Sequence, residues 1–215
     1  MIHNVNFIKM NEVKKKIDQM LKNIKSGDAS VSELIDYIKA SMNDASFDQK
    51  ANILANIFKE HPTSVVSKIL EVDFYPDDEY IKLAIAKTGN KSLIKKLLKL
   101  DYMGWSLEST IVGTNDDELI AMLIERKDLT WWTEAYIAGT TTNREVVLKL
   151  LDKDNLCEEA QAAIAQNFAC DNVVFFKFLC RPDLHRDMIL ILAANYRYQV
   201  TGNATIEGVP VHIDN

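Results

Sequence analysis

The feature that most constrains the fold is internal repetition between His61 and Arg197. A pair of adjacent apolar residues returns at spacings of 28, 26, 27 and 27 residues, and a second apolar pair follows four residues later in the first four copies. Repetition at a period of 20–50 residues is typical of stacked repeat proteins, in which each unit buries its apolar face only against its neighbours. The first pairs are Val65-Val66, Leu93-Ile94, Leu119-Ile120, Val146-Val147 and Val173-Val174.

Each repeat is predicted to contain two short helices. Small residues mark the first helix, and the second opens at a residue whose side chain can accept a hydrogen bond from the backbone of the first turn. Helices of two to three turns are marginal in water, so packing on neighbouring units must hold them. The predicted first helices span residues 77–88, 105–112, 132–138, 158–168 and 182–196, and the predicted N-caps of the second helices are Asn90, Asn115, Thr142 and Asp171.

The N-terminal region has a different pattern and is predicted to cap the repeats. Residues 8–25 carry apolar side chains at three- and four-residue steps, with Gly27 just past their end as a C-cap. Ser30 and Ser46 are each followed three residues later by a Glu or Gln, which is a capping box that opens a helix. Because a repeat array needs an atypical unit to cover its last apolar face, we expect residues 1–60 to form this N-terminal cap.

One sequence pattern resembles a known family. The pattern A-I-A-x-x-x-N, followed by L-x-x-L and then an acid, resembles the leucine-rich repeat variant family and, more broadly, HEAT- and armadillo-type helical arrays. Residues 84–90 and 163–167 carry it best, and it covers residues 62–197. The resemblance implies a superhelical architecture and is carried over for architecture alone.

The predicted fold is therefore all-α, a right-handed α-α superhelix. It consists of the N-terminal helical cap, a solenoid of about five short helical hairpins over residues 61–197, and a C-terminal extended tail or β-hairpin over residues 198–215, in one continuous structural unit.

The charge distribution excludes some classes of partner. Residues 1–100 carry 16 Lys and Arg against 13 Asp and Glu, whereas residues 101–215 carry 9 against 18. Nucleic-acid binding depends on basic surface, because counterion release from phosphates supplies much of the affinity. The acidic second half argues against nucleic acid and against anionic membranes as partners. No apolar run approaches the roughly 18 residues of a membrane span.

The cysteines indicate the compartment. They are odd in number, at Cys157, Cys170 and Cys180, and lack a C-x-x-C spacing. Together with the absence of an apolar secretory segment near the N-terminus, this predicts buried thiols in a reducing cytoplasm.

No motif assigns catalysis, a metal or a cofactor. The four histidines are scattered, without a cysteine or acid at ligand spacing. The acidic runs at 77–79 and 116–118 are predicted to lie in first turns of helices, where the helix dipole favours negative charge. The acid or amide that recurs at residues 73, 101, 128, 155 and 183 is predicted to cap the turn between units. The alternative is a ligand bound along the edge that these residues line.

Three tryptophans are candidates for partner binding. Trp105 and Trp131 are 26 residues apart, at the same place in consecutive units, and Trp132 is adjacent. The favoured interpretation is packing in the core or between units. The alternative is an aromatic binding surface, because Trp is enriched at the energetic hot spots of interfaces.

A lysine face is a second candidate. Lys91, Lys95 and Lys99 share one side of a predicted helix. A solvated face is the favoured interpretation, and contact with an anionic patch on a partner is the alternative.

A stripe along the second helices changes from basic to apolar. It ends at Leu148, Phe175 and Phe176, which are predicted to be covered by the C-terminal stretch, by a partner or by a second subunit, because exposed apolar patches are usually covered or used. The stripe comprises Ser67-Lys68, Lys95-Lys96, Ala121-Met122, Leu148-Lys149 and Phe175-Phe176.

Together these patterns favour a non-catalytic protein–protein interaction module. It would act as an adaptor or as an inhibitor of a larger complex, and its acidic flank would even suit a partner's nucleic-acid groove by charge mimicry. One alternative is an enzyme similar to the HEAT-like base-excision glycosylases, which would use Asp128 and the three tryptophans on DNA. The other is a homo-oligomeric structural protein.

Overall fold

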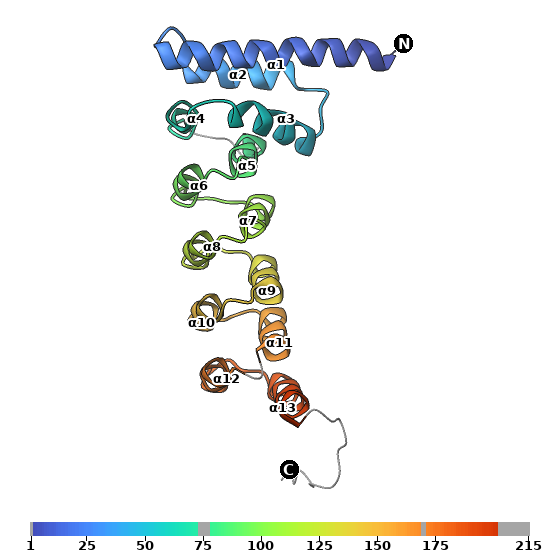
Figure 1. Ribbon diagram of the computed structural model, residues 1–215, viewed down its shortest axis with the longest axis vertical. Coiled ribbons are helices and arrows are strands. Elements are labelled where there is room, and N and C mark those ends of the chain that lie inside the picture. The colour runs from blue at the N-terminus through green and yellow to red at the C-terminus, as the bar shows by residue number, and fades with distance from the viewer. Residues whose placement is uncertain (1, 73–77, 169–170, 202–215) are drawn as a thin grey trace. The chain divides into compact units, whose positions relative to one another are not determined.

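The computed structural model describes residues 2–72, 78–168 and 171–201 (Figure 1). Every regular element in these residues is an α-helix, and the 13 helices found there pack against their neighbours, which confirms the all-α prediction. None of these helices is both long and apolar enough to cross a membrane. The chain divides into two compact units, residues 1–129 and 130–215, and each is described by itself.

In unit 1, two series of helices follow an N-terminal group. Helix α1 packs on α2, α3 and α4. Helices α3, α5 and α7 then pack one on the next, and α4, α6 and α8 form a second series (Figure 1). The helices are α1 (Ile2–Ser26), α2 (Val31–Ser41), α3 (Phe47–Lys59), α4 (Thr63–Ile69), α5 (Glu79–Lys87), α6 (Lys91–Leu97), α7 (Trp105–Val112) and α8 (Asp117–Ile124).

Unit 2 repeats the same two-series arrangement. Helix α11 packs on α9 and α13, and α12 packs on α10. The helices are α9 (Trp131–Thr140), α10 (Arg144–Leu151), α11 (Glu158–Asn167), α12 (Asn172–Leu179) and α13 (Arg186–Thr201).

The predicted ends of the N-terminal helices are confirmed. Ser30 and Ser46 each form a complete capping box, and Gly27 follows α1 with φ of +90°, a left-handed conformation that favours glycine. Helix α1 nevertheless begins at Ile2, several residues before the predicted start at residue 8.

Two of the four predicted N-caps are wrong by one residue. Helix α8 is capped by Asp116, whose carboxylate accepts from the backbone of its first turn, and α10 is capped by Asn143. Asn115, the predicted cap, has φ of +53°, a left-handed conformation that Asn tolerates, so it ends the preceding turn instead. In the second case the predicted cap, Thr142, lies just before the observed one. In both cases two adjacent residues can cap a helix, so the sequence pattern did not decide between them.

The C-terminal prediction is partly wrong. Helix α13 was predicted over residues 182–196, but it starts at Arg186 and continues to Thr201, so residues 198–201 are helical rather than part of a tail or hairpin. Residues 202–215 lie outside the described residues, as do three other residues that the sequence singled out, Asp73, Asp77 and Cys170.

The recurring apolar pairs form the core. Every member of the five first pairs is buried except Val173. Leu97, Leu123 and Leu150, from the second pairs, have no exposed surface at all. Burying one such side chain contributes about 1.5–3 kcal/mol, so the pairs supply the main attraction between consecutive helices. Val173 is exposed because, among the described helices, none packs on α12 from its far side.

A polar contact recurs at the N-termini of the second helices. In each case the first residue of one helix contacts the N-cap residue of the next helix in the series. Because the N-cap is fixed by its own hydrogen bonds, this contact sets how far one helix slides along the other. The three contacts are Thr63 Oγ1 to Asn90 Nδ2 (2.8 Å), Lys91 to Asp116 (2.7 Å) and Arg144 to Asp171 (3.5 Å).

Arg126 makes a further contact between second helices, at their C-terminal ends. The Arg126 guanidinium donates to the carbonyl oxygens of Leu98 and Leu100, both at 2.7 Å, where α6 ends. It also pairs with Asp128 at 2.7 Å. A cation suits this place because carbonyls at a helix C-terminus lack intrahelical partners and carry partial negative charge.

The same arrangement returns 55 residues later, which is about two periods of the sequence repeat. Arg181 donates to the carbonyl oxygens of Leu151 (2.5 Å) and Lys153 (3.0 Å) and pairs with Asp183 (2.6 Å). At residues 128 and 183 the recurring Asp therefore holds an arginine that contacts the end of the preceding helix in its series. The contacts of these two carboxylates thus correct the prediction that they cap the turn.

Replacing Arg126 by Met should destabilise the protein by about 2–3 kcal/mol, because two partly buried carbonyls lose charge-assisted hydrogen bonds. Urea unfolding followed by circular dichroism measures this loss. Lys127→Met, at the exposed neighbouring residue, is the control and should change stability by less than about 0.5 kcal/mol. Equal unfolding midpoints for the two variants would contradict the assigned role of Arg126.

Candidate functional site

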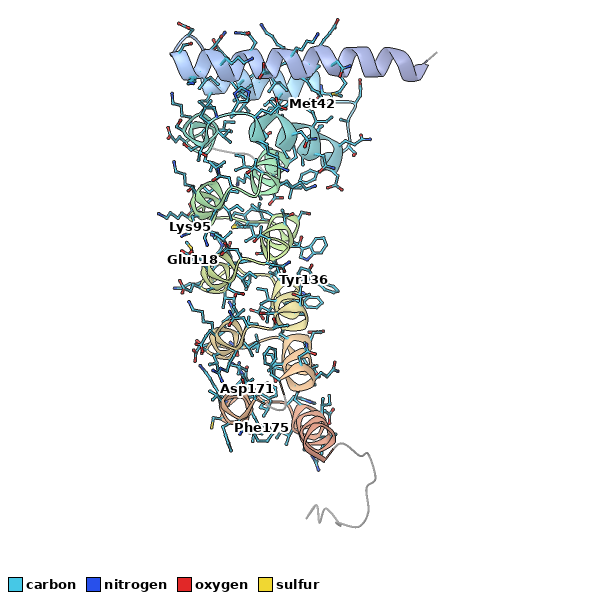
Figure 2. The ribbon with its side chains drawn as sticks, in the orientation of Figure 1. Met42, Lys95, Glu118, Tyr136, Asp171 and Phe175 are labelled. Carbon is cyan, nitrogen blue, oxygen red and sulfur yellow. The ribbon has the colours of Figure 1, made fainter. Side chains whose placement is uncertain are left out.

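Three aromatic side chains are exposed on the short helix α9. Trp131, Trp132 and Tyr136 expose 43%, 58% and 44% of their surface. The two tryptophan rings stack with centroids 3.8 Å apart and planes inclined by 27°. Tyr136 lies four residues after Trp132 and therefore on the same side of the helix, pointing away from its neighbours (Figure 2). We call these three residues the α9 aromatic patch.

The exposure of these residues contradicts a position in the core, which was one part of the favoured interpretation. Trp131 and Trp132 do not pack in a core, and neither does Trp105 on α7, which exposes 55% of its surface. The buried side of α9 is instead formed by Thr133, Glu134, Ile137 and Ala138. Single exposed apolar residues are normal, but three large aromatics on one helix form a patch of the kind that marks interaction sites.

Buried polar residues recur in the first helices, and sequence reasoning missed them. Glu134 is buried, accepts a hydrogen bond from the Cys157 backbone N–H at 3.2 Å and lies 3.5 Å from the Lys153 ammonium. Gln161 is also buried and donates to the Leu156 carbonyl at 2.9 Å. The recurrence of a polar residue at spacings of 26 and 27 residues could have identified this position from the sequence. The three residues at this position are Glu108, Glu134 and Gln161.

Cys157 joins the N-termini of α9 and α11. Its Sγ lies 3.3 Å from the Trp131 carbonyl oxygen and also accepts from the Ala160 backbone N–H, as the N-cap of α11. The next two residues, Glu158 and Glu159, are exposed. Two acidic side chains therefore begin the helix that packs beside the aromatic patch.

The thiol at this junction is held in its protonated form. Burial raises the pKa of Cys157 to about 11, and the negative charges of Glu134 and Glu159 act in the same direction. The sequence prediction of buried thiols fits this half-buried residue but is wrong for Cys180, which is exposed at the end of α12.

The predicted lysine face is largely engaged within unit 1. Lys91 pairs with Asp116 and, at 2.8 Å, with Glu118, and Lys95 also pairs with Glu118 (Figure 2). The hydrogen bonds from the two lysines hold the pKa of Glu118 below its ordinary value. Lys99 is exposed. Two of the three candidate lysines thus connect α6 to α8, so the acidic run at 116–118 serves both as a cap and as a set of ion-pair partners.

The predicted apolar stripe in unit 2 is only partly exposed. Leu148 and Phe175 are half-buried, whereas Phe176 exposes 64% of its surface and meets Phe175 edge to face. Val173 and Leu179 are exposed three residues before and after Phe176, so the three residues lie on one side of the helix. We call Val173, Phe176 and Leu179 the α12 apolar side.

An open depression of about 560 Å³ lies where α10 and α12 end. Its lining includes both signs of charge, but Lys177 pairs with Asp152 and Arg181 with Asp183, each at 2.6 Å. The described residues contain no group of three or more His, Cys, Asp or Glu side chains placed to hold a metal ion. The aromatic patch, with its acidic neighbours, is therefore the stronger candidate site.

Alkylation of Cys157 should be slow at pH 8, because the thiolate is the reacting form and the raised pKa keeps it scarce. In a variant with Cys170 and Cys180 replaced by Ser, the iodoacetamide rate should rise about tenfold per pH unit until the pH nears 11. Glu159→Gln should speed the reaction at pH 8, because it removes a charge that raises the pKa, whereas Glu145→Gln on α10 should not. A flat pH dependence would contradict this environment.

A scan against protein-family models, a search of curated proteins and a search of solved structures each found no match to the chain. The proposals below therefore rest on the positions, burial and charges of the described residues.

Proposed function

We propose that the chain is a non-catalytic protein-binding module that contacts a protein partner through the α9 aromatic patch. The observation that carries this proposal is the exposure of Trp131, Trp132 and Tyr136 together on one helix. Tryptophan and tyrosine dominate interface hot spots, because each buries a large rigid surface at a small loss of conformational entropy. A module of this kind would serve as an adaptor or as an inhibitor of a larger complex.

We further propose that the helical hairpins combine into an α-α superhelix. Two kinds of contact support this proposal, because each repeats one geometry from hairpin to hairpin. They are the N-cap contacts and the hydrogen bonds of the two arginines to the end of the preceding helix. Stacked repeats of this type offer extended binding surfaces. The free thiols of Cys157 and Cys180 suit the reducing cytoplasm in which we place the protein.

The DNA-enzyme alternative gains no support from Asp128, its acidic residue. The Asp128 carboxylate is paired with Arg126, which in turn contacts the preceding helix, so this acid has a structural role. We therefore do not carry that alternative forward.

Replacing Trp132 and Tyr136 together by Ala should reduce partner binding at least thirtyfold, because interface hot spots contribute about 2 kcal/mol or more each. Affinity capture from the native cell, with quantitative mass spectrometry of wild type against variant, identifies the proteins lost, and titration with the purified partner gives the affinity. Trp105→Ala, on the exposed tryptophan of α7, is the matched control. Capture of the same proteins by the double variant would reject the patch as the binding surface.

Self-association is a second candidate function, and the α12 apolar side favours it. Val173 is exposed here, although its counterpart Val146 is buried beneath the next helix of its series. A second copy of the chain, stacking on α12, would cover the same position. This contact would be the basis of a homo-oligomeric structural protein.

Phe176→Ser should abolish this association, because it removes the most exposed aromatic of the α12 apolar side. Light scattering of the wild type should show a mass above the 24.4 kDa of one chain that grows with concentration, and the variant should stay at one chain. A wild type of 24.4 kDa at every concentration would refute self-association. In that event, dye binding after deletion of residues 202–215 shows whether the C-terminal stretch covers this side.

A further inference from the structure

We propose that the partner presents an arginine-containing basic segment, held jointly by the α9 aromatic patch and by the carboxylates of Glu158 and Glu159 on α11. This inference rests on the proposed binding function and names the chemistry of the partner.

The N-termini of α9 and α11 lie close together. Helices α9 and α11 pack side by side. The Cys157 Sγ lies 3.3 Å from the Trp131 carbonyl, and the Cys157 backbone N–H donates to Glu134. Glu158 and Glu159 follow Cys157 directly, so the two carboxylates begin their helix next to the first turn of α9.

The same repeat positions hold aromatic rings in α9 and carboxylates in α11. Trp131 and Trp132 precede Glu158 and Glu159 by 27 residues each, one repeat period. All four side chains are exposed. Axes of packed helices lie about 8–10 Å apart, and alternate residues of an extended chain are about 7 Å apart. One extended segment is therefore long enough to place neighbouring side chains on the rings and on the carboxylates.

The ion pairs of the described residues leave out both carboxylates. Among the described residues, no Lys or Arg forms an ion pair with Glu158 or Glu159, in contrast to Glu118, which pairs with two lysines. Residues 130–215 carry 7 Lys and Arg against 11 Asp and Glu, a net charge of −4. Unit 2 therefore attracts cations and repels phosphate groups.

Arginine suits both halves of this surface. Its guanidinium is planar, stacks on indole and phenol faces, and donates two parallel hydrogen bonds to a carboxylate. The ammonium of lysine is a compact, strongly hydrated charge that stacks less well. The pairing of rings with free acids thus favours arginine over lysine, and both over a neutral segment.

The experiment uses three labelled peptides of equal length, in which Gly-Ser spacers separate arginine, lysine or citrulline residues. Fluorescence anisotropy with the full chain should rank them arginine, then lysine, then citrulline, and the arginine affinity should fall as salt increases. Glu158→Gln with Glu159→Gln should lower the arginine affinity about tenfold and flatten its salt dependence. Trp132→Ala with Tyr136→Ala should remove the preference for arginine over lysine.

A matched control removes the same amount of charge elsewhere. Asp36→Asn with Glu60→Gln neutralises two exposed carboxylates of unit 1 and should leave the arginine affinity unchanged. Urea unfolding of each variant checks that loss of binding is not loss of fold.

Three outcomes overturn the inference. They are equal binding of arginine and citrulline peptides, arginine binding that survives the double Gln variant, and an arginine preference that survives loss of Trp132 and Tyr136. With any of these, the proposed function still stands if the aromatic variant fails to capture the cellular partner. If that variant captures the partner normally, the proposed function itself fails, whatever the peptides do.

Discussion

Burial of branched apolar side chains between consecutive helices is the interaction on which the rest of the structure depends. Helices of seven to ten residues, such as α6 and α9, are too short to persist alone in water. The fully buried Leu97, Leu123 and Leu150 provide the contacts that hold them. Since this attraction has no direction, it determines that the helices pack but not how they are aligned.

Alignment comes from polar contacts at both ends of the second helices. At the N-termini, an N-cap residue such as Asp116 also contacts the first residue of the preceding helix in its series. At the C-termini, Arg126 and Arg181 donate to carbonyl oxygens at the end of the preceding helix in the series. Hydrogen bonds need short distances and defined angles, so they select one alignment among those that apolar packing permits.

The candidate site follows from an unusual distribution of side chains on α9. Glu134 occupies the buried side, where it holds the start of α11, and the aromatic rings are left outside. The acid is stabilised there by the Cys157 N–H and the Lys153 ammonium, which offset the loss of water around its charge. The same contact brings Glu158 and Glu159 beside the rings, so one buried acid assembles both halves of the proposed binding surface.

The sequence by itself determined the all-α class, the repeat period, the buried apolar pairs and several helix ends, because these follow from local periodicity and capping chemistry. It did not determine which side of α9 faces outward, because both sides carry large or polar residues, and contacts with α10 and α11 distinguish them. Nor did it show that Lys91 is paired with α8 or that Arg126 contacts α6. Those partners lie about one repeat away in the chain, and only tertiary packing brings them within hydrogen-bonding distance.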